Sequence, residues 1–142
     1  MSLAYLLDTN VISEPLRPAP NAYVLERLEQ HEAEIAIASV VWHELLYGTY
    51  RLSPSAKRSA IEDYLNDVVA LAFPILSYDA RAALWHAAER ARLVSSGNTP
   101  SFADGQIAAI AQVNDLILVT ANISDFFMYQ GLQVENWFEP PA

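Results

Sequence analysis

Short apolar runs alternate with longer amphipathic stretches along the chain. The apolar runs have the length of buried strands, and most of them end at a turn or a polar residue. They cover residues 3–7, 35–38, 73–76, 116–119 and 132–135. The stretches between them repeat their apolar residues at helical spacing. Strands that alternate with helices predict an α/β fold, with a mainly parallel sheet covered by helices on both faces.

Polar residues that can cap helices mark where the predicted helices begin. A short helix at residues 11–14 comes first. The candidate N-caps of the later helices are Asn21, Ser39, Asp79 and Ser101. We expect the second of these helices to end near Gly48 and the fourth at Val113. Another helix is expected to begin at Ser53 and Pro54, with the proline in its first turn.

The composition suits one folded domain over residues 1–142. Hydrophobic residues make up 53% and charged ones 18%, which predicts a large apolar core. No apolar run reaches the roughly 18 residues that span a membrane, and the N-terminus lacks the pattern of a signal peptide. The lack of cysteine excludes disulfides, thiolate zinc sites and thiol catalysis. We therefore expect a soluble, cytoplasmic protein with no membrane contact.

The formal net charge of −9 argues against broad nucleic-acid binding, which requires Lys and Arg to neutralise phosphates. The chain has 8 such residues, and Lys57 is the only lysine. A bound divalent metal would offset part of the negative charge. An acidic protein also suits a basic protein partner.

Asp8, Thr120 and Asp125 follow the two most apolar predicted strands. We expect these strands at the centre of the sheet, and ligands of an open parallel sheet bind beyond the carboxyl ends of its strands. Two of these residues also have simpler explanations, since Asp8 can cap a helix and Asp125 can close a turn. Taken one residue at a time, both interpretations stay open.

Glu44 and Asp104 lie on predicted helices, on the side that carries the buried apolar residues. Glutamate is almost never buried without a partner, whereas Asp104 can also be explained by the favourable dipole at a helix start. Unpaired like charges raise one another's pKa, so a convergence of Asp8, Glu44, Asp104 and Asp125 would indicate a bound cation. An all-oxygen site suits Mg²⁺ or Mn²⁺ rather than zinc.

The histidines and aromatic residues give weaker indications. His31, His43 and His86 do not form a close ligand pair. We expect His43 at the surface or facing a partner, and His86 in the core or a groove. Four aromatic residues can stack bases, although we favour core or protein-interface positions for them: Trp42, Tyr47, Tyr50 and Trp137.

Two other phosphoryl chemistries fit poorly. An aspartyl-phosphatase needs a second aspartate two positions after its nucleophile, where this chain has Asn10. Such an enzyme and a phospho-receiver domain both need a lysine near the site, but Lys57 lies far from any predicted strand end. The chain also lacks a Gly-rich phosphate loop and a Gly-x-Ser-x-Gly turn.

Four sequence blocks resemble the PIN-domain ribonucleases, in particular the VapC-type toxins of toxin–antitoxin pairs. They are residues 5–14 (YLLDTNVISE), 38–48 (ASVVWHELLYG), 103–111 (ADGQIAAIA) and 118–126 (LVTANISDF). Their order and spacing match over nearly the whole chain. The resemblance implies a three-layer sandwich of helices around a four- or five-stranded parallel sheet. It also implies divalent-metal-dependent cleavage of single-stranded RNA.

The resemblance assigns roles to individual residues. The family's metal-binding acids match Asp8, Glu44, Asp104 and, as the more variable fourth, Asp125. Thr9 and Thr120 would be polar helpers near the metal or water, and Asn122 would order its loop. The implied partners are an RNA substrate, a second copy in a homodimer, and an antitoxin whose basic tail occupies the acidic cleft.

The alternative hypothesis is a PIN-like binding module that assembles with a protein but no longer cuts. The presence of all four acids disfavours this module, whereas the low count of Lys and Arg favours it. Arg81, Arg90 and Arg92, on the helix before Asp104, are candidate RNA contacts. Metal dependence of the activity separates the two hypotheses.

Overall fold

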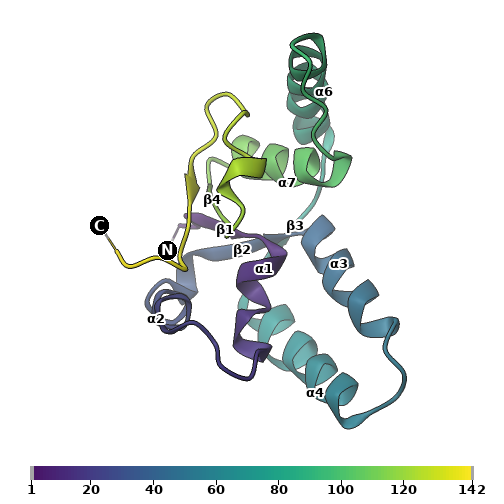
Figure 1. Ribbon diagram of the computed structural model, residues 1–142, viewed down its shortest axis with the longest axis vertical. Coiled ribbons are helices and arrows are strands. Elements are labelled where there is room, and N and C mark those ends of the chain that lie inside the picture. The colour runs from purple at the N-terminus through teal and green to yellow at the C-terminus, as the bar shows by residue number, and fades with distance from the viewer. Residues whose placement is uncertain (1, 142) are drawn as a thin grey trace.

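The computed structural model describes residues 2–141 and contains one five-stranded parallel sheet (Figure 1). The strands are β1 (Tyr5–Leu7), β2 (Ile35–Ala38), β3 (Ile75–Leu76), β4 (Ile117–Val119) and β5 (Val134–Glu135). They lie in the order β3-β2-β1-β4-β5, with Leu6 between Ala36 and Leu118. The predicted central pair, β1 and β4, is confirmed as adjacent, and both strands are short and almost completely buried.

Helices cover both faces of the sheet, as the α/β pattern predicts. In Figure 1, α7 lies on one face with α6 beyond it, while α1, α3 and α4 lie on the other side. The α-helices are α1 (Thr9–Ile12), α2 (Ala22–Gln30), α3 (Ser39–Tyr50), α4 (Ala56–Tyr64), α5 (Ala70–Ala72), α6 (Ala80–Ser95) and α7 (Phe102–Val113). A π-helical turn, η3 (Leu65–Val69), joins α4 to α5, and three short 3₁₀ turns are η1 (Glu14–Leu16), η2 (Glu32–Glu34) and η4 (Ile123–Asp125).

Three of the four predicted helix caps are confirmed. The side chains of Asn21, Asp79 and Ser101 each accept a hydrogen bond from a backbone N–H in the first turn of their helix. The predicted cap at Ser39 is wrong, because Ser39 is already the first residue of α3. That helix also continues past Gly48, which takes a helical conformation, to Tyr50.

The start of α4 is also corrected. The prediction began this helix at Ser53 and Pro54, but both residues precede it. Ser55 caps it instead, because its hydroxyl accepts a hydrogen bond from the N–H of Arg58 at 3.1 Å. A cap of this kind can satisfy the helix start without a proline in the first turn.

His86 packs directly against the backbone of α7. It belongs to the buried stripe of α6 formed by Ala82, His86, Glu89 and Leu93. Its Nδ1 lies 2.8 Å from the Tyr78 hydroxyl. Burial, with a contribution from Arg90, lowers the pKa of His86, so the ring is mostly neutral at pH 7. The predicted core position of His86 is confirmed.

Gly105 makes this close approach possible, because an added Cβ would lie 2.1 Å from the His86 Nε2. Glycine at this position therefore sets how closely α6 and α7 pack. Since α7 carries Asp104, the same contact helps to fix that carboxylate relative to the sheet.

Among residues 2–141, no helix has the length and apolar character that crossing a bilayer would require.

Replacing Gly105 with alanine should therefore destabilise the fold. The clash with His86 is expected to lower the free energy of unfolding by about 1–3 kcal/mol. The matched control is Gly48→Ala, where an added Cβ meets nothing within 4 Å. That helical substitution should raise stability by about 0.5–1 kcal/mol. Urea unfolding measures both changes, and a Gly105→Ala protein as stable as the control would contradict this account of the helix contact.

Candidate functional site

Asp8 joins the end of the central strand to the start of a helix. It follows β1 directly and caps α1, since its Oδ1 accepts a hydrogen bond from the N–H of Thr9 at 2.8 Å. The residue is only 7% exposed. The two interpretations of Asp8, helix cap and site carboxylate, are therefore compatible in one geometry.

Thr120 and Asn10 hold the second oxygen of Asp8. The buried Thr120 hydroxyl donates to Asp8 Oδ2 at 2.9 Å, and the Asn10 side-chain amide donates to the same oxygen at 3.3 Å. Asn10 Oδ1 also accepts from the N–H of Ala121 at 2.9 Å, and Thr120 Oγ1 accepts from the N–H of Asn122 at 3.0 Å. These bonds tie the carboxyl ends of β1 and β4 together around one carboxylate.

The part played by Asn10 was not predicted from the sequence. The signal available was its position two residues after Asp8, at the carboxyl end of a strand. The expected loop-ordering role of Asn122 is matched by its backbone N–H, while its side chain is exposed.

Glu44 reaches the same region from α3. Its Oε2 accepts a hydrogen bond from the Thr9 hydroxyl at 2.7 Å. Thr9 thus contacts both acids, through its backbone N–H to Asp8 and through its side chain to Glu44. The half-buried Glu44 has the polar partner that its place on the buried side of a helix led us to expect.

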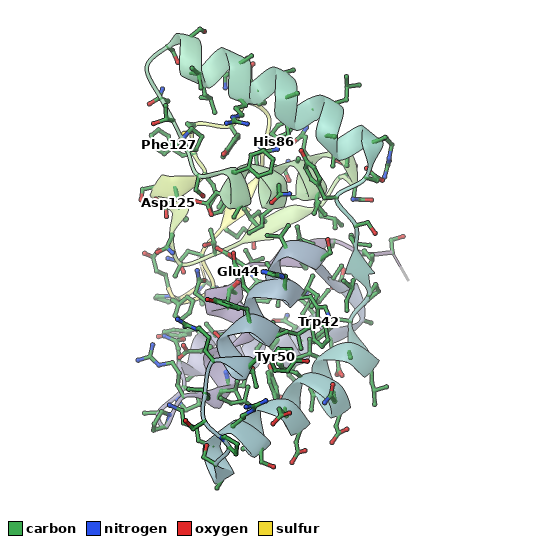
Figure 2. The ribbon with its side chains drawn as sticks, turned by 90° about the vertical axis from the view of Figure 1, so that its right-hand side faces the viewer. Trp42, Glu44, Tyr50, His86, Asp125 and Phe127 are labelled. Atoms are coloured by element: carbon green, nitrogen blue, oxygen red, sulfur yellow. The ribbon has the colours of Figure 1, made fainter. Side chains whose placement is uncertain are left out.

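Asp104 and Asp125 are the other two predicted acids, and we call Asp8, Glu44, Asp104 and Asp125 together the acidic region. Asp104 lies in the first turn of α7, and Asp125 ends η4, where it is exposed at the edge (Figure 2). Partial burial raises the pKa of Asp104, and the negative charges of Asp8, Asp125 and Glu44 raise it further. Asp104 therefore lies within electrostatic reach of the other three predicted carboxylates.

The Asp8 carboxyl shows the same effects. Burial raises its pKa and Glu44 adds to the rise, while the hydrogen bonds from Thr9, Thr120 and Asn10 lower it in part. The net direction is upward for both Asp8 and Asp104, so burial and repulsion outweigh the hydrogen bonds. A nearby cation would reverse this balance.

The four carboxylates are close but do not form a closed ligand cage. Among the residues the structure describes, no three Asp, Glu or His side chains come close enough together to hold a metal ion as they stand. Their chemistry nevertheless fits a hard divalent cation, because every donor is oxygen. Glu44, Asp104 and Asp125 are each at least partly open to solvent, so these side chains have room to adjust.

An ion pair between the buried Glu89 and the exposed Arg92 fixes the loop that follows Asp125. Glu89 on α6 accepts two hydrogen bonds from Arg92, at 2.8 and 2.9 Å, and one from the N–H of Gln130 at 2.8 Å. Arg92 also donates to the carbonyl of Met128 at 3.0 Å. These contacts were not predicted. The i,i+3 spacing of Glu89 and Arg92 was the only signal for them in the sequence.

The other two histidines stack on aromatic residues. His31 stacks against Trp137 in a cluster with Tyr5, and Trp137 is buried, which confirms its predicted core position. His43 is exposed and stacks on Tyr47, which is also exposed, so its predicted surface position is confirmed.

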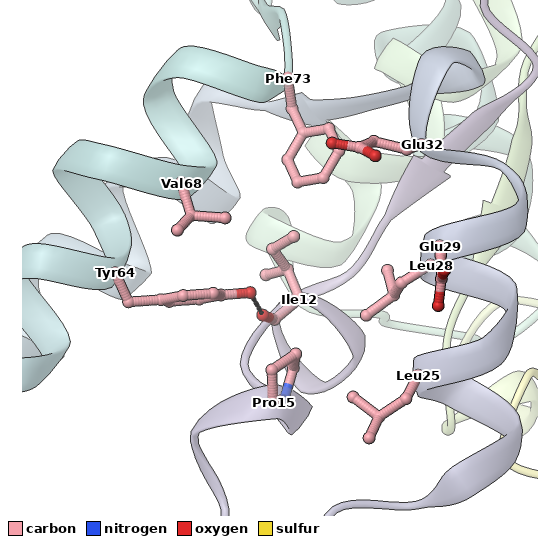
Figure 3. Close-up of a pocket in the computed structure, with 9 residues that line it drawn as sticks. All are labelled: Ile12, Pro15, Leu25, Leu28, Glu29, Glu32, Tyr64, Val68 and Phe73. Carbon is pink, nitrogen blue, oxygen red and sulfur yellow. Dashed lines mark hydrogen bonds between the residues drawn. The ribbon is translucent and has the colours of Figure 1, made fainter.

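An apolar cavity of about 280 Å³ opens on another part of the molecule, where α1, α2 and α4 approach one another (Figure 3). The Tyr64 hydroxyl donates to the carbonyl of Ile12 at 2.7 Å beside it. Its lining residues are Ile12, Pro15, Leu25, Leu28, Glu29, Glu32, Tyr64, Val68 and Phe73. The cavity includes none of the four carboxylates, so it is a separate feature from the acidic region.

Comparison with known proteins decides the family, because a sequence model of the PIN domain matches residues 5–126. The chain belongs to the PIN-domain family. A relative of this PIN domain is the tRNA(fMet)-specific endonuclease VapC of Shigella flexneri, 32% identical over 136 residues that cover 95% of this chain and 98% of that protein. Another is toxin FitB of Neisseria gonorrhoeae, 34% identical over 137 residues that cover 94% of this chain and 99% of that protein.

Solved structures confirm the predicted three-layer PIN fold. The crystal structure of FitAcB from Neisseria gonorrhoeae matches this PIN domain with a TM-score of 0.88 and 32% identity, over 96% of this chain and 99% of that chain. The crystal structure of DNA-bound VapBC from Salmonella typhimurium matches with a TM-score of 0.83 and 27% identity, over 95% of this chain and 98% of that chain. PIN-domain ribonucleases generally use a divalent metal, which agrees with the all-oxygen chemistry of the acidic region.

Proposed function

We propose that this PIN domain is a metal-dependent endoribonuclease and the toxin of a type II toxin–antitoxin pair. It hydrolyses phosphodiester bonds in single-stranded regions of RNA, and residues 1–142 act as a single nuclease domain. The observation that carries this proposal is that Asp104 lies near three other carboxylates, whose charges add to the rise that burial causes in its pKa. Relatives named as VapC endonucleases and ribonucleases, about 30% identical over nearly their full length, support it.

In this proposal Asp8, Glu44 and Asp104 hold the cation, with Asp125 as the more variable fourth acid. The cation is Mg²⁺ or Mn²⁺, and when bound it lowers the pKa of a water molecule and offsets charge on the phosphate. Attack by water in line with the leaving oxygen gives a 5′-phosphate and a 3′-hydroxyl.

The neighbouring polar residues act on the acids. Thr120 and Asn10 fix the orientation of the Asp8 carboxylate, and Thr9 fixes that of Glu44. Such support matters because a catalytic carboxylate must be held close to its working geometry. We therefore include Thr120 in the active site as a positioning residue.

A binding module that no longer cuts remains the alternative function. The observation in its favour is the charge of −9, with only 8 Lys and Arg residues. It leaves the energetic cost of four neighbouring carboxylates unexplained, and for that reason we favour the nuclease.

The cleavage assay tests the nuclease directly. Asp104→Asn should lower the rate of RNA cutting by at least about a hundredfold, because one proposed ligand is lost. The variant should unfold at the same urea concentration as the wild type or higher, since charge repulsion falls. A pool of structured and single-stranded RNAs would be incubated with Mg²⁺, Mn²⁺ or EDTA. Cutting by a folded Asp104→Asn protein at the wild-type rate would remove this residue from the mechanism, and cutting in EDTA would remove the metal.

The proposed protein partners are a second copy of the chain and an antitoxin with a basic tail that reaches the acidic region. Solved relatives include toxin–antitoxin complexes, among them FitAB bound to a DNA fragment. We assign the apolar cavity in Figure 3 to apolar residues of the antitoxin, with Glu29 and Glu32 suited to basic residues beside them. Since RNA and antitoxin are both made in the cytoplasm, we propose that the protein acts there.

Leu28→Glu tests the assignment of the cavity. A charge in this apolar lining should weaken antitoxin binding at least about tenfold, while RNA cleavage by the free variant stays unchanged. The antitoxin would be co-expressed with each protein and its co-purification measured. Undiminished co-purification with Leu28→Glu would show that the antitoxin binds elsewhere.

A further inference from the structure

Ion pairing leaves few positive side chains to meet a phosphate. Four of the eight lysines and arginines are paired with acids: Arg17, Arg58, Arg81 and Arg92. Arg81 and Arg92, two of the predicted RNA contacts, are thus engaged within the protein, on Asp79 and Glu89. In the part of the chain that the structure describes, the remaining four form no ion pair: Arg27, Arg51, Lys57 and Arg90.

Arg90 of α6 lies over an exposed aromatic ring at the start of α7, the helix that carries Asp104. Its guanidinium carbon is 5.3 Å from the centre of the Phe102 ring, and Phe102 is the first residue of α7, two residues before Asp104. Phe102 is 51% exposed although one side of its ring packs on His86, with the ring centres 4.9 Å apart. The phenylalanine is therefore held in place while much of its surface faces solvent.

Arg51 and Tyr47 repeat this arrangement next to Glu44. The Arg51 guanidinium carbon is 5.2 Å from the centre of the Tyr47 ring, which is 57% exposed and stacks on His43. From Glu44, Tyr47 lies about 60° around α3 and Arg51 about 20°, so both share the side of the helix that carries the acid. Each of the two helices that supply an acid thus carries an exposed aromatic ring that an arginine covers, Arg90 of α6 over Phe102 of α7 and Arg51 over Tyr47 of α3.

We propose that these two pairs bind unpaired bases of the RNA on either side of the cleaved phosphate. The inference rests on the proposed nuclease function and specifies how its substrate is held. The bases stack on Phe102 and Tyr47, and the guanidinium groups of Arg90 and Arg51 meet the neighbouring phosphates. Phe127 is 74% exposed and lies near Asp125, on the face of the molecule that also shows Glu44 (Figure 2). It is a further exposed aromatic side chain near the acidic region.

The arrangement explains how so acidic a protein can bind RNA. Stacking needs no net charge, is available to every base, and requires the base to be unpaired. Two phosphate contacts would give a shallow salt dependence, with a slope of about −1.4 in log affinity against log salt for a single strand. A protein that bound through a broad basic surface would show a steeper slope.

The test is RNA affinity in an Asp104→Asn background, where the RNA is not consumed. The probe is a fluorescent single-stranded RNA of mixed sequence, with an abasic version of the same length, and binding is followed by anisotropy. Phe102→Leu and Tyr47→Leu should each weaken binding of the normal RNA by on the order of tenfold. Neither should change binding of the abasic strand. Phe102→Leu keeps an apolar side chain against His86, and urea unfolding checks that it remains folded.

Tyr50 and Arg58 provide the matched control. They form a third arginine–aromatic pair, at 5.8 Å, and Tyr50 is 60% exposed. Here Arg58 is already engaged within the protein, because it is ion-paired with Glu62 at 3.3 Å and donates to the carbonyl of Leu52 at 2.9 Å. Tyr50→Leu should leave RNA binding unchanged.

Two outcomes would overturn the proposal. One is equal binding of normal RNA by the Phe102→Leu, Tyr47→Leu and Tyr50→Leu proteins. The other is a change in sedimentation mass without a change in RNA affinity, which would assign the pairs to a protein interface. The wild type is assayed for cleavage in parallel. If it cuts no RNA, the nuclease function fails, whereas normal cutting with unaffected binding in the variants rejects only the stacking sites.

Discussion

The hydrogen bond from Thr120 to Asp8 is the contact on which the acidic region depends. It joins the ends of two central strands and holds a charged group that is almost completely buried. Burying an unpaired carboxylate would cost several kcal/mol, and the bonds from Thr120, Thr9 and Asn10 offset that cost in part. With Asp8 fixed, Thr9 positions Glu44, and the packing of α7 on α6 brings Asp104 close.

The acidic region lowers the stability of the fold, because it holds partly buried carboxylates close to other carboxylates. Burial raises the pKa of Asp8 and Asp104, and the neighbouring carboxylates raise it further, so neutral residues at these two positions would remove both costs. Elsewhere the chain pairs its buried charges, as Glu89 does with Arg92 and the N–H of Gln130. Within residues 2–141, by contrast, Asp8, Glu44, Asp104 and Asp125 form no ion pair with a lysine, arginine or histidine, so hydrogen bonds alone offset their charge.

Local sequence signals predicted the parts of the fold that depend on neighbouring residues. Short apolar runs gave the five strands, and Asn21, Asp79 and Ser101 gave three helix starts. The four acids were also proposed from the sequence, since each follows an apolar strand or lies on a buried helix face. Periodicity failed where two cap candidates were close, as at Ser53 and Ser55, and where Gly48 stayed helical.

The remaining contacts join residues far apart in the chain. Asn10 bonds to Ala121, Glu89 to Gln130 and Arg90 stacks on Phe102. Such pairs leave no periodic trace, because their geometry exists only once the helices and strands have packed. For the same reason the sequence did not show which arginines are ion-paired within the protein and which are left to contact a ligand.

The measurement that tests the central claim most directly is calorimetric titration of the purified protein with Mn²⁺ and Mg²⁺. If the four carboxylates form a cation site, the wild type should bind either ion with a saturable heat. Asp8→Asn should lose most of that binding, whereas Tyr50→Leu should retain it. Wild-type protein that shows no saturable binding, or a folded Asp8→Asn protein that binds as tightly as the wild type, would contradict this account.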